Sequence, residues 1–209
     1  MASSFDKNVF INCPLDKAYV PLLRTLLFTV LYVGLRPRLA PEQADSSETR
    51  VSKIMRLIRQ SRFGIHDLSR CKATKKGEIF RLNMPFELGL DIGCKAFRGG
   101  KWKRKKCLIL ETKKYRYKAA ISDLSNSDIL AHRNDPREVV NQTRHWLNQE
   151  VPRLTAAAPS VIWGKFLDFM AEDYDDLTVK GWSKKDIECM AVPELLQRMR
   201  LWMKRNKDN

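Results

Sequence analysis

The sequence predicts an α/β fold with a parallel sheet of about five strands, helices on both faces and a helical appendage at the C-terminus. Short apolar segments alternate with longer helical patterns over the first 150 residues, as in chains that form parallel sheets. The 209 residues are 44% hydrophobic and 30% charged, a globular composition that can bury a sizeable core. We expect an α/β domain over 1–152 and a helical subdomain over 160–209, joined by a linker rich in small residues.

Hydrophobic periodicity places the individual elements. Gly34 is expected to end the first long helix, and the pair Asp135-Pro136 to open a later one. We expect strands over 8–12, 35–40, 63–68, 106–111 and 129–132. Helices are expected over 21–33, from within 44–48 to 62, from about Pro85 onward, and over 117–124, 136–150, 161–172, 184–190 and 193–205.

The helix that ends at 62 has two distinct faces. Val51, Ile54, Met55 and Ile58 recur at helical spacing and predict the face that packs on the sheet. Four basic residues lie on the other face, which is most simply exposed to solvent, although a basic strip could also meet a phosphate.

Two neighbouring stretches carry the candidate chemistry. Asp67 ends the strand at 63–68, and in open parallel sheets ligands bind at the edge where strands end. Pro85 marks the first turn of the next helix, which places Glu87 in the same turn, where the helix dipole favours an ionised carboxylate. Taken singly, a capping role for Glu87 and a turn-forming role for Asp67 are the commoner interpretations.

The same helix carries two stripes of residues spaced four apart. Asn83, Glu87 and Asp91 form a polar stripe, and Gly89 and Gly93 form a small one. The glycine pair is expected to let the helix approach the sheet closely.

This arrangement resembles nucleoside 2-deoxyribosyltransferases and the related TIR-type NAD hydrolases. In that superfamily a helix-borne Glu acts at the anomeric carbon of a ribose or deoxyribose, as a nucleophile or by holding the sugar hydroxyls. Glu87 is the matching position. The chain has Asn-Met-Pro where the transferases tend to have Gly-Thr, and its loop before the helix is longer and more basic. The resemblance rests on Asp67, Leu68, Asn83, Phe86, Glu87, Leu88 and Gly89.

The resemblance implies a flavodoxin-like, doubly wound sheet and a hydrolase that cleaves the N-glycosidic bond of NAD or a related nucleotide. Glu87 and Asp67 would be catalytic, and NAD would be a substrate; no cofactor is expected. Asn12, Asp16 and Asn83 would bind the substrate, although Asp16 is equally suited to cap the following helix. Members of the family often act as toxic effectors in antiviral defence.

Two alternatives come from other classes of protein. One is a non-catalytic nucleotide-sensing module of the same fold. The other is a nucleic-acid-binding protein, since the net charge of +15 and the pI near 9.8 predict affinity for polyanions. The run Lys101–Lys106, which includes Trp102, has the ingredients of a phosphate-contacting loop, but it is more simply a soluble turn.

Several kinds of site are not expected. The loop after the first strand lacks a GxGxxG pattern and a Walker lysine, which argues against a Rossmann site or a P-loop. No metal site is expected, because the three histidines lie far apart and none pairs with a cysteine or carboxylate at a ligand spacing. His66 should pack in the core and point away from Asp67, since alternate strand residues face opposite sides.

Cysteine usage and hydropathy bear on the compartment and on assembly. The odd number of cysteines, five, predicts buried free thiols in a reducing cytoplasm. No secretory signal is apparent, and the most apolar run, 20–35, is too short to span a membrane. Two apolar faces within 160–209 must pack on the first domain or on another subunit, so a homo-oligomer is one expectation.

Overall fold

The sheet has the predicted architecture. The computed structural model describes residues 4–42, 47–71, 82–114 and 128–206. Five parallel strands lie in the order β2-β1-β3-β4-β5, the flavodoxin-like doubly wound arrangement. The strands are β1 (Asn8–Asn12), β2 (Arg36–Arg38), β3 (Phe63–Asp67), β4 (Lys106–Glu111) and β5 (Ile129–Ala131).

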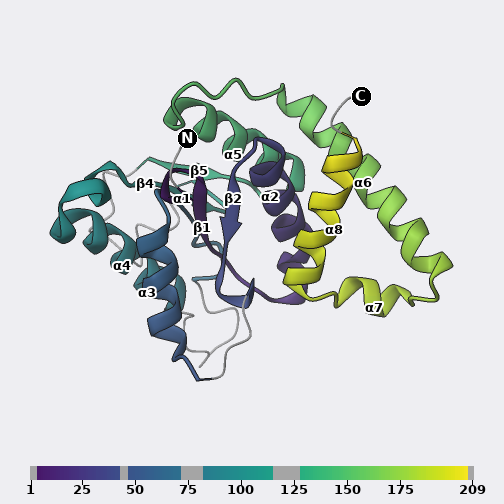
Figure 1. Cartoon of the computed structure of the whole chain (residues 1–209), viewed down its shortest axis with the longest axis horizontal. Coiled ribbons are helices and arrows are strands. Elements are labelled where there is room, and N and C mark those ends of the chain that lie inside the picture. Colours follow the sequence, from purple (N-terminus) through teal and green to yellow (C-terminus); the bar gives the residue numbers. More distant parts are fainter. Residues whose placement is uncertain (1–3, 43–46, 72–81, 115–127, 207–209) are drawn as a thin grey trace.

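Helices cover both faces of this sheet (Figure 1). Helices α3 and α4 lie on one face, α2 and α5 on the other, and α6 and α8 pack outside α2. The helices are α1 (Ser4–Lys7), α2 (Val20–Tyr32), α3 (Arg50–Gln60), α4 (Asn83–Arg98), α5 (Pro136–Glu150), α6 (Pro159–Val179), α7 (Lys184–Glu188) and α8 (Val192–Arg205). Three short 3-10 turns are η1 (Lys17–Tyr19), η2 (Ala40–Glu42) and η3 (Gly100–Arg104).

The main core joins the sheet to the C-terminal helices. Phe28 of α2 is fully buried and contacts the rings of Phe166 and Phe169 on α6 and of Trp202 on α8. The apolar faces of the appendage therefore pack on the α/β unit of the same chain.

Several helix ends agree with the sequence prediction. Gly34 follows α2 with a φ of 81°, and the amide of Leu35 donates to the carbonyl of Val30, which closes the helix end. Asp135 caps α5 by accepting a hydrogen bond from the amide of Arg137 at 2.8 Å.

Other boundaries differ from the prediction. Helix α3 begins at Arg50, after its N-cap Thr49, rather than within 44–48, because the Thr49 hydroxyl accepts from the amide of Ser52. Strand β2 is three residues long, since the chain turns into η2 at Ala40. Helix α6 begins inside the expected linker and continues to Val179. The helix predicted over 117–124 lies outside the described residues.

The buried face of α3 is also rotated from the predicted one. Ile54 and Ile58 are buried as expected, but Val51 and Met55 are exposed and Leu57 is buried in their place. None of the described helices combines the length and hydropathy needed to cross a membrane.

Candidate functional site

Glu87 is a buried carboxylate on α4, near the edge where the strands end. The helix begins at Asn83, so Glu87 is its fifth residue. The prediction that Glu87 lies in the first turn is therefore wrong, because the helix starts two residues before Pro85. The Glu87 side chain is nearly inaccessible, and Oε1 lies 3.7 Å from a guanidinium nitrogen of Arg50 on α3. Burial raises the pKa of Glu87 to about 6, against the opposing charge of Arg50. The helix dipole therefore does not hold this pKa low, although the carboxyl is mostly ionised at neutral pH.

Asn12 positions the helix that carries Glu87. Its side-chain amide donates to the carbonyl of Met84, in the first turn of α4, at 2.9 Å, and lies 3.1 Å from Nδ1 of His66. Because Asn12 is buried at the end of β1, it ties the start of α4 to the sheet. Asn12 was predicted to bind substrate, and in the structure its side-chain amide instead contacts Met84 and His66.

Asp67 is fully buried and bound by three donors. Oδ2 accepts from the Tyr19 hydroxyl at 2.5 Å and lies 3.1 Å from Nε2 of His132, while Oδ1 accepts from the amide of Ser69 at 2.8 Å. Nδ1 of His132 accepts from the amide of Asn134, so Nε2 carries the proton. Burial alone would raise the pKa of Asp67, but these partners, His132 foremost, lower it below its usual value.

Three of the predicted carboxylates, Asp67, Glu87 and Asp16, lie near enough to Cys13 to affect the pKa of its thiol. Burial raises the pKa of the Cys13 thiol well above its usual value, and the charges of Asp67, Glu87 and Asp16 raise it further. The structure therefore brings these three predicted residues to the same edge. Asp16 does not cap η1 through its side chain, and its Oδ2 lies 3.6 Å from the guanidinium of Arg70.

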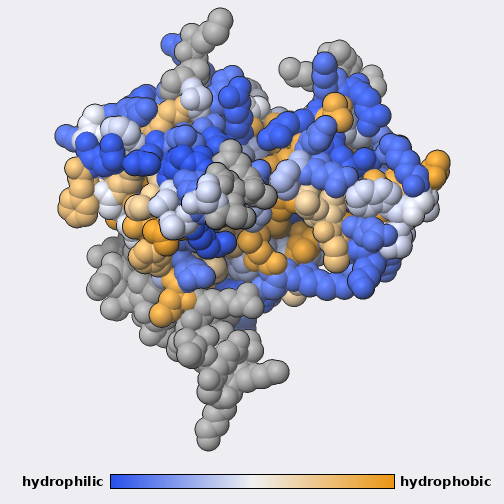
Figure 2. Space-filling view, turned by 60° about the horizontal axis from the view of Figure 1, so that its bottom comes forward, coloured by the Kyte–Doolittle hydropathy of each residue, from blue (hydrophilic) through white to orange (hydrophobic). Residues whose placement is uncertain are grey.

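The exposed surface near Glu87 is partly apolar. Figure 2 turns the edge where the strands end toward the viewer and shows hydrophobic side chains among hydrophilic ones. Asn83, the last predicted site residue, is exposed at the start of α4. Leu82 and Phe86 are exposed beside it, and Val51 is exposed next to Arg50.

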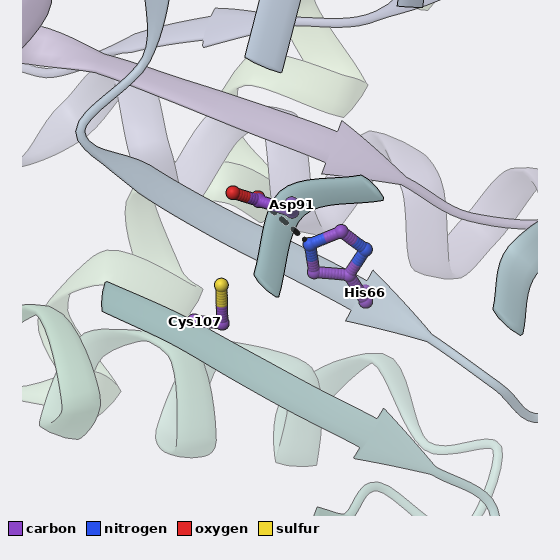
Figure 3. A group of neighbouring side chains, drawn as sticks. All are labelled: His66, Asp91 and Cys107. Atoms are coloured by element: carbon purple, nitrogen blue, oxygen red, sulfur yellow. Dashed lines mark hydrogen bonds and ion pairs between the residues drawn. The ribbon is translucent and has the colours of Figure 1, made fainter. Parts of the chain in front are cut away.

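A second buried network lies deeper under α4. Asp91 reaches down from the helix, and its Oδ2 lies 3.0 Å from Nε2 of His66 on β3 (Figure 3). Its Oδ1 lies 3.0 Å from the ammonium of Lys105, which is also fully buried. His66 is therefore packed in the core and turned away from Asp67, as predicted.

Gly64 makes this approach of helix and strand possible. A Cβ at Gly64 would collide with Oδ2 of Asp91 and lie 2.8 Å from Nε2 of His66. The predicted glycine stripe on α4 does not have this role, because Gly89 has open space around it and Gly93 faces only the ring of Phe97.

His66, Asp91 and Cys107 place a nitrogen, an oxygen and a sulfur within 4.8 Å of one another (Figure 3). Lys105 already supplies a positive charge to Asp91, and burial raises the pKa of the Cys107 thiol, which disfavours the thiolate that binds metals. We therefore describe this group as a buried ion pair of Lys105 and Asp91, with His66 hydrogen-bonded to Asp91. Sequence spacing gave no sign of it, because its members come from two strands and a helix.

Comparisons of the chain with protein-family models, with curated proteins and with solved structures found no match. Function is therefore inferred from the residues and their geometry.

Proposed function

We propose that this protein hydrolyses the N-glycosidic bond of NAD or a related nucleotide, with Glu87 as the catalytic residue. The burial of Glu87, its raised pKa and its few partners support this proposal. Among the described residues, Arg50 is its only ion-pair partner, whereas Asp67 and Asp91 are each bound by two or more groups. A buried carboxyl with a raised pKa and few partners is typical of a functional site.

The chemistry follows from the charge that develops during cleavage. As the base leaves with the electron pair of the glycosidic bond, positive charge forms on the ribose ring. Ionised Glu87 would stabilise that charge or attack the anomeric carbon, and water would then complete the hydrolysis. Asp67 would position the sugar or orient Glu87 and would not itself react, since its oxygens already contact Tyr19, His132 and the Ser69 amide.

Two arginines favour a nucleotide over a nucleoside. Arg50 lies beside Glu87 with 56% of its side chain exposed, and Arg70 lies near Asp16 with 32% exposed. Guanidinium groups bind phosphates in a bidentate manner, so these two would hold a pyrophosphate beside the ribose. The apolar side chains of Leu82 and Phe86 would contact the base.

A nucleotide-sensing module without chemistry is the second candidate. It is favoured by the three partners of Asp67, because a carboxylate so bound is not free to address a sugar. A role in antiviral defence and a homo-oligomer formed through the C-terminal helices remain predictions from the resemblance and the sequence.

The test compares Glu87→Gln with the native chain. We expect the variant to lose on the order of a hundredfold or more in the rate of nicotinamide or free-base release from NAD and from a panel of nucleosides, because the charge is lost while size is kept. Glu194→Gln, in the first turn of α8, is the matched control and should retain full activity. The assay uses concentrated protein in case assembly is required.

The outcomes separate the candidates. Undiminished release by Glu87→Gln would refute the catalytic role. Nucleotide binding by the native chain without release of any base would support the sensor instead.

A further inference from the structure

A basic hollow lies at the opposite edge of the sheet, where the strands begin. Its volume is about 580 Å³, within the range of small-molecule sites. It is formed by the starts of β1 and β2, the C-terminal end of α3, η3 and α8. Five-residue strands separate it from the Glu87 edge by roughly 16 Å. The cations that line it are Arg36, Arg38, Arg56, Arg59, Lys101 and Arg200.

Four of these six cations, Arg36, Arg59, Lys101 and Arg200, form no ion pair with the described residues, whereas the other two do. Arg38 pairs with Glu42 and Arg56 with Glu48, each at 2.7 Å. Within the described ranges, no ion pair or side-chain hydrogen bond is formed by the guanidinium groups of Arg36, Arg59 and Arg200. These three arginines come from β2, α3 and α8, which are far apart in the sequence.

The negative end of the α3 dipole, which also points toward this edge, is covered by donors. The Asn8 amide donates to the carbonyl of Gln60 at 2.9 Å, and the Trp102 indole donates to that of Arg59 at 3.0 Å. The buried ammonium of Lys105 binds the carbonyls of Ile58 and Ser61. The exposed cations therefore determine the potential of the hollow.

From these observations we propose that the hollow binds an anion that carries several phosphates. Guanidinium groups bind phosphate oxygens in a bidentate manner, and three that form no ion pair with the described residues line this one hollow, which favours more than one phosphate. Trp102 is not free to stack on a base, because the guanidinium of Arg98 lies 4.3 Å from its ring centroid and its indole nitrogen is hydrogen-bonded. Recognition is thus by charge and independent of base identity.

The proposed polyanion site is the hollow, and most of the run Lys101–Lys106 lies outside it. Lys105 is fully buried in that run, and Lys106 pairs with Glu150 at 3.0 Å. Only Lys101 contributes to the hollow. The site does not depend on the chemistry proposed for Glu87.

The test uses the full chain and two probes, a fluorescent single-stranded oligonucleotide of mixed sequence and inorganic tripolyphosphate. The site variant is Arg36→Gln/Arg59→Gln/Arg200→Gln. The control, Arg137→Gln/Lys184→Gln/Lys185→Gln, removes the same charge from exposed residues away from the hollow. Thermal unfolding verifies that both variants fold.

We expect the site variant to bind at least about tenfold more weakly than the native chain at low salt. For the oligonucleotide, three lost contacts should also reduce the slope of log affinity against log salt by about 2. The control should stay within about twofold of the native chain. If tripolyphosphate displaces a bound oligonucleotide, the two probes share the site and a nucleic-acid backbone is a ligand. If tripolyphosphate binds but the oligonucleotide does not, free polyphosphates are the ligand. Equal weakening by both variants, or no binding of either probe to the native chain, would overturn the proposal.

Discussion

Three buried carboxyl groups have different protonation behaviour because they have different partners. Burial by itself disfavours the charged form of each. The pKa of Asp67 is nevertheless lowered, because His132 and its other partners outweigh the burial. The pKa of Asp91 is lowered in the same way, mainly by His66. Arg50 is the only ion-pair partner of Glu87 among the described residues, and the pKa of Glu87 rises to about 6. A charge left poorly compensated in this way lowers stability, as is common where a residue is kept for function.

Glu87→Gln should therefore stabilise the fold at neutral pH. The folded pKa of about 6 lies above the ordinary value of 4.5, so the folded state binds the proton more tightly. This group's contribution to stability is thus lost as the pH rises from about 4.5 through 6. Urea denaturation at pH 7.5 should show the variant more stable by on the order of 1 kcal/mol, with a smaller difference at pH 4.5. A variant less stable than the native chain at pH 7.5 would contradict this account, and the control Glu194→Gln should not stabilise the fold at that pH.

At the scale of elements, the buried ammonium of Lys105 joins α3, α4 and the start of β4. It lies 3.0 Å from Asp91 on α4 and donates to the carbonyl of Ile58 on α3. Asp91 in turn contacts His66 on β3, above Gly64. The helices on this face of the sheet are thus held by polar contacts as well as by the small apolar cluster of Phe10, Ile54, Leu57 and Ile58.

Lys105→Met should destabilise the protein by about 3–5 kcal/mol, because it leaves a buried carboxylate and backbone carbonyls without their cation. The adjacent Lys106→Met is the matched control. The Lys106 side chain is 47% exposed and pairs with Glu150, so its loss should cost no more than about 1 kcal/mol. The measurement is the free energy of unfolding in denaturant for both variants. Similar small costs would show that the buried pair contributes little.

At the scale of the whole molecule, the C-terminal helices complete the core over α2. Phe166 and Phe169 on α6 and Trp202 on α8 surround Phe28, and the Trp202 indole donates to Glu172 at 2.7 Å. Arg24 of α2 also donates to the carbonyl of Ile187 on α7. Stability of the α/β unit should therefore depend on residues more than a hundred positions away.

Trp202→Ala tests this dependence. Trp202 is 3% exposed, so its truncation should leave a cavity and cost about 3–5 kcal/mol. The neighbouring Leu201 is 53% exposed, and Leu201→Ala should change stability little. Thermal and denaturant unfolding should show one cooperative transition that shifts as a whole for Trp202→Ala. A separate early transition, with the rest unchanged, would indicate that the tail unfolds independently.

The sequence by itself determined the positions of the five strands along the chain, the helix end at Gly34, the helix start after Asp135, and the placement of Asp67 at a strand end and Glu87 on the next helix. These features depend on local periodicity and on turn chemistry, which are encoded within a few neighbouring residues. The orientation of His66 away from Asp67 was predictable for the same reason, since strand residues alternate.

Only the tertiary structure decided which polar groups are satisfied and which remain available. It placed Tyr19 and His132 beside Asp67 and gave Glu87 one ion-pair partner among the described residues, Arg50. It also buried Lys105 within a run that is more simply a soluble turn from sequence alone. It also gathered Arg36, Arg59 and Arg200 around one hollow. The physical reason is that desolvation and charge pairing depend on through-space neighbours, and those neighbours come from segments that the sequence keeps far apart.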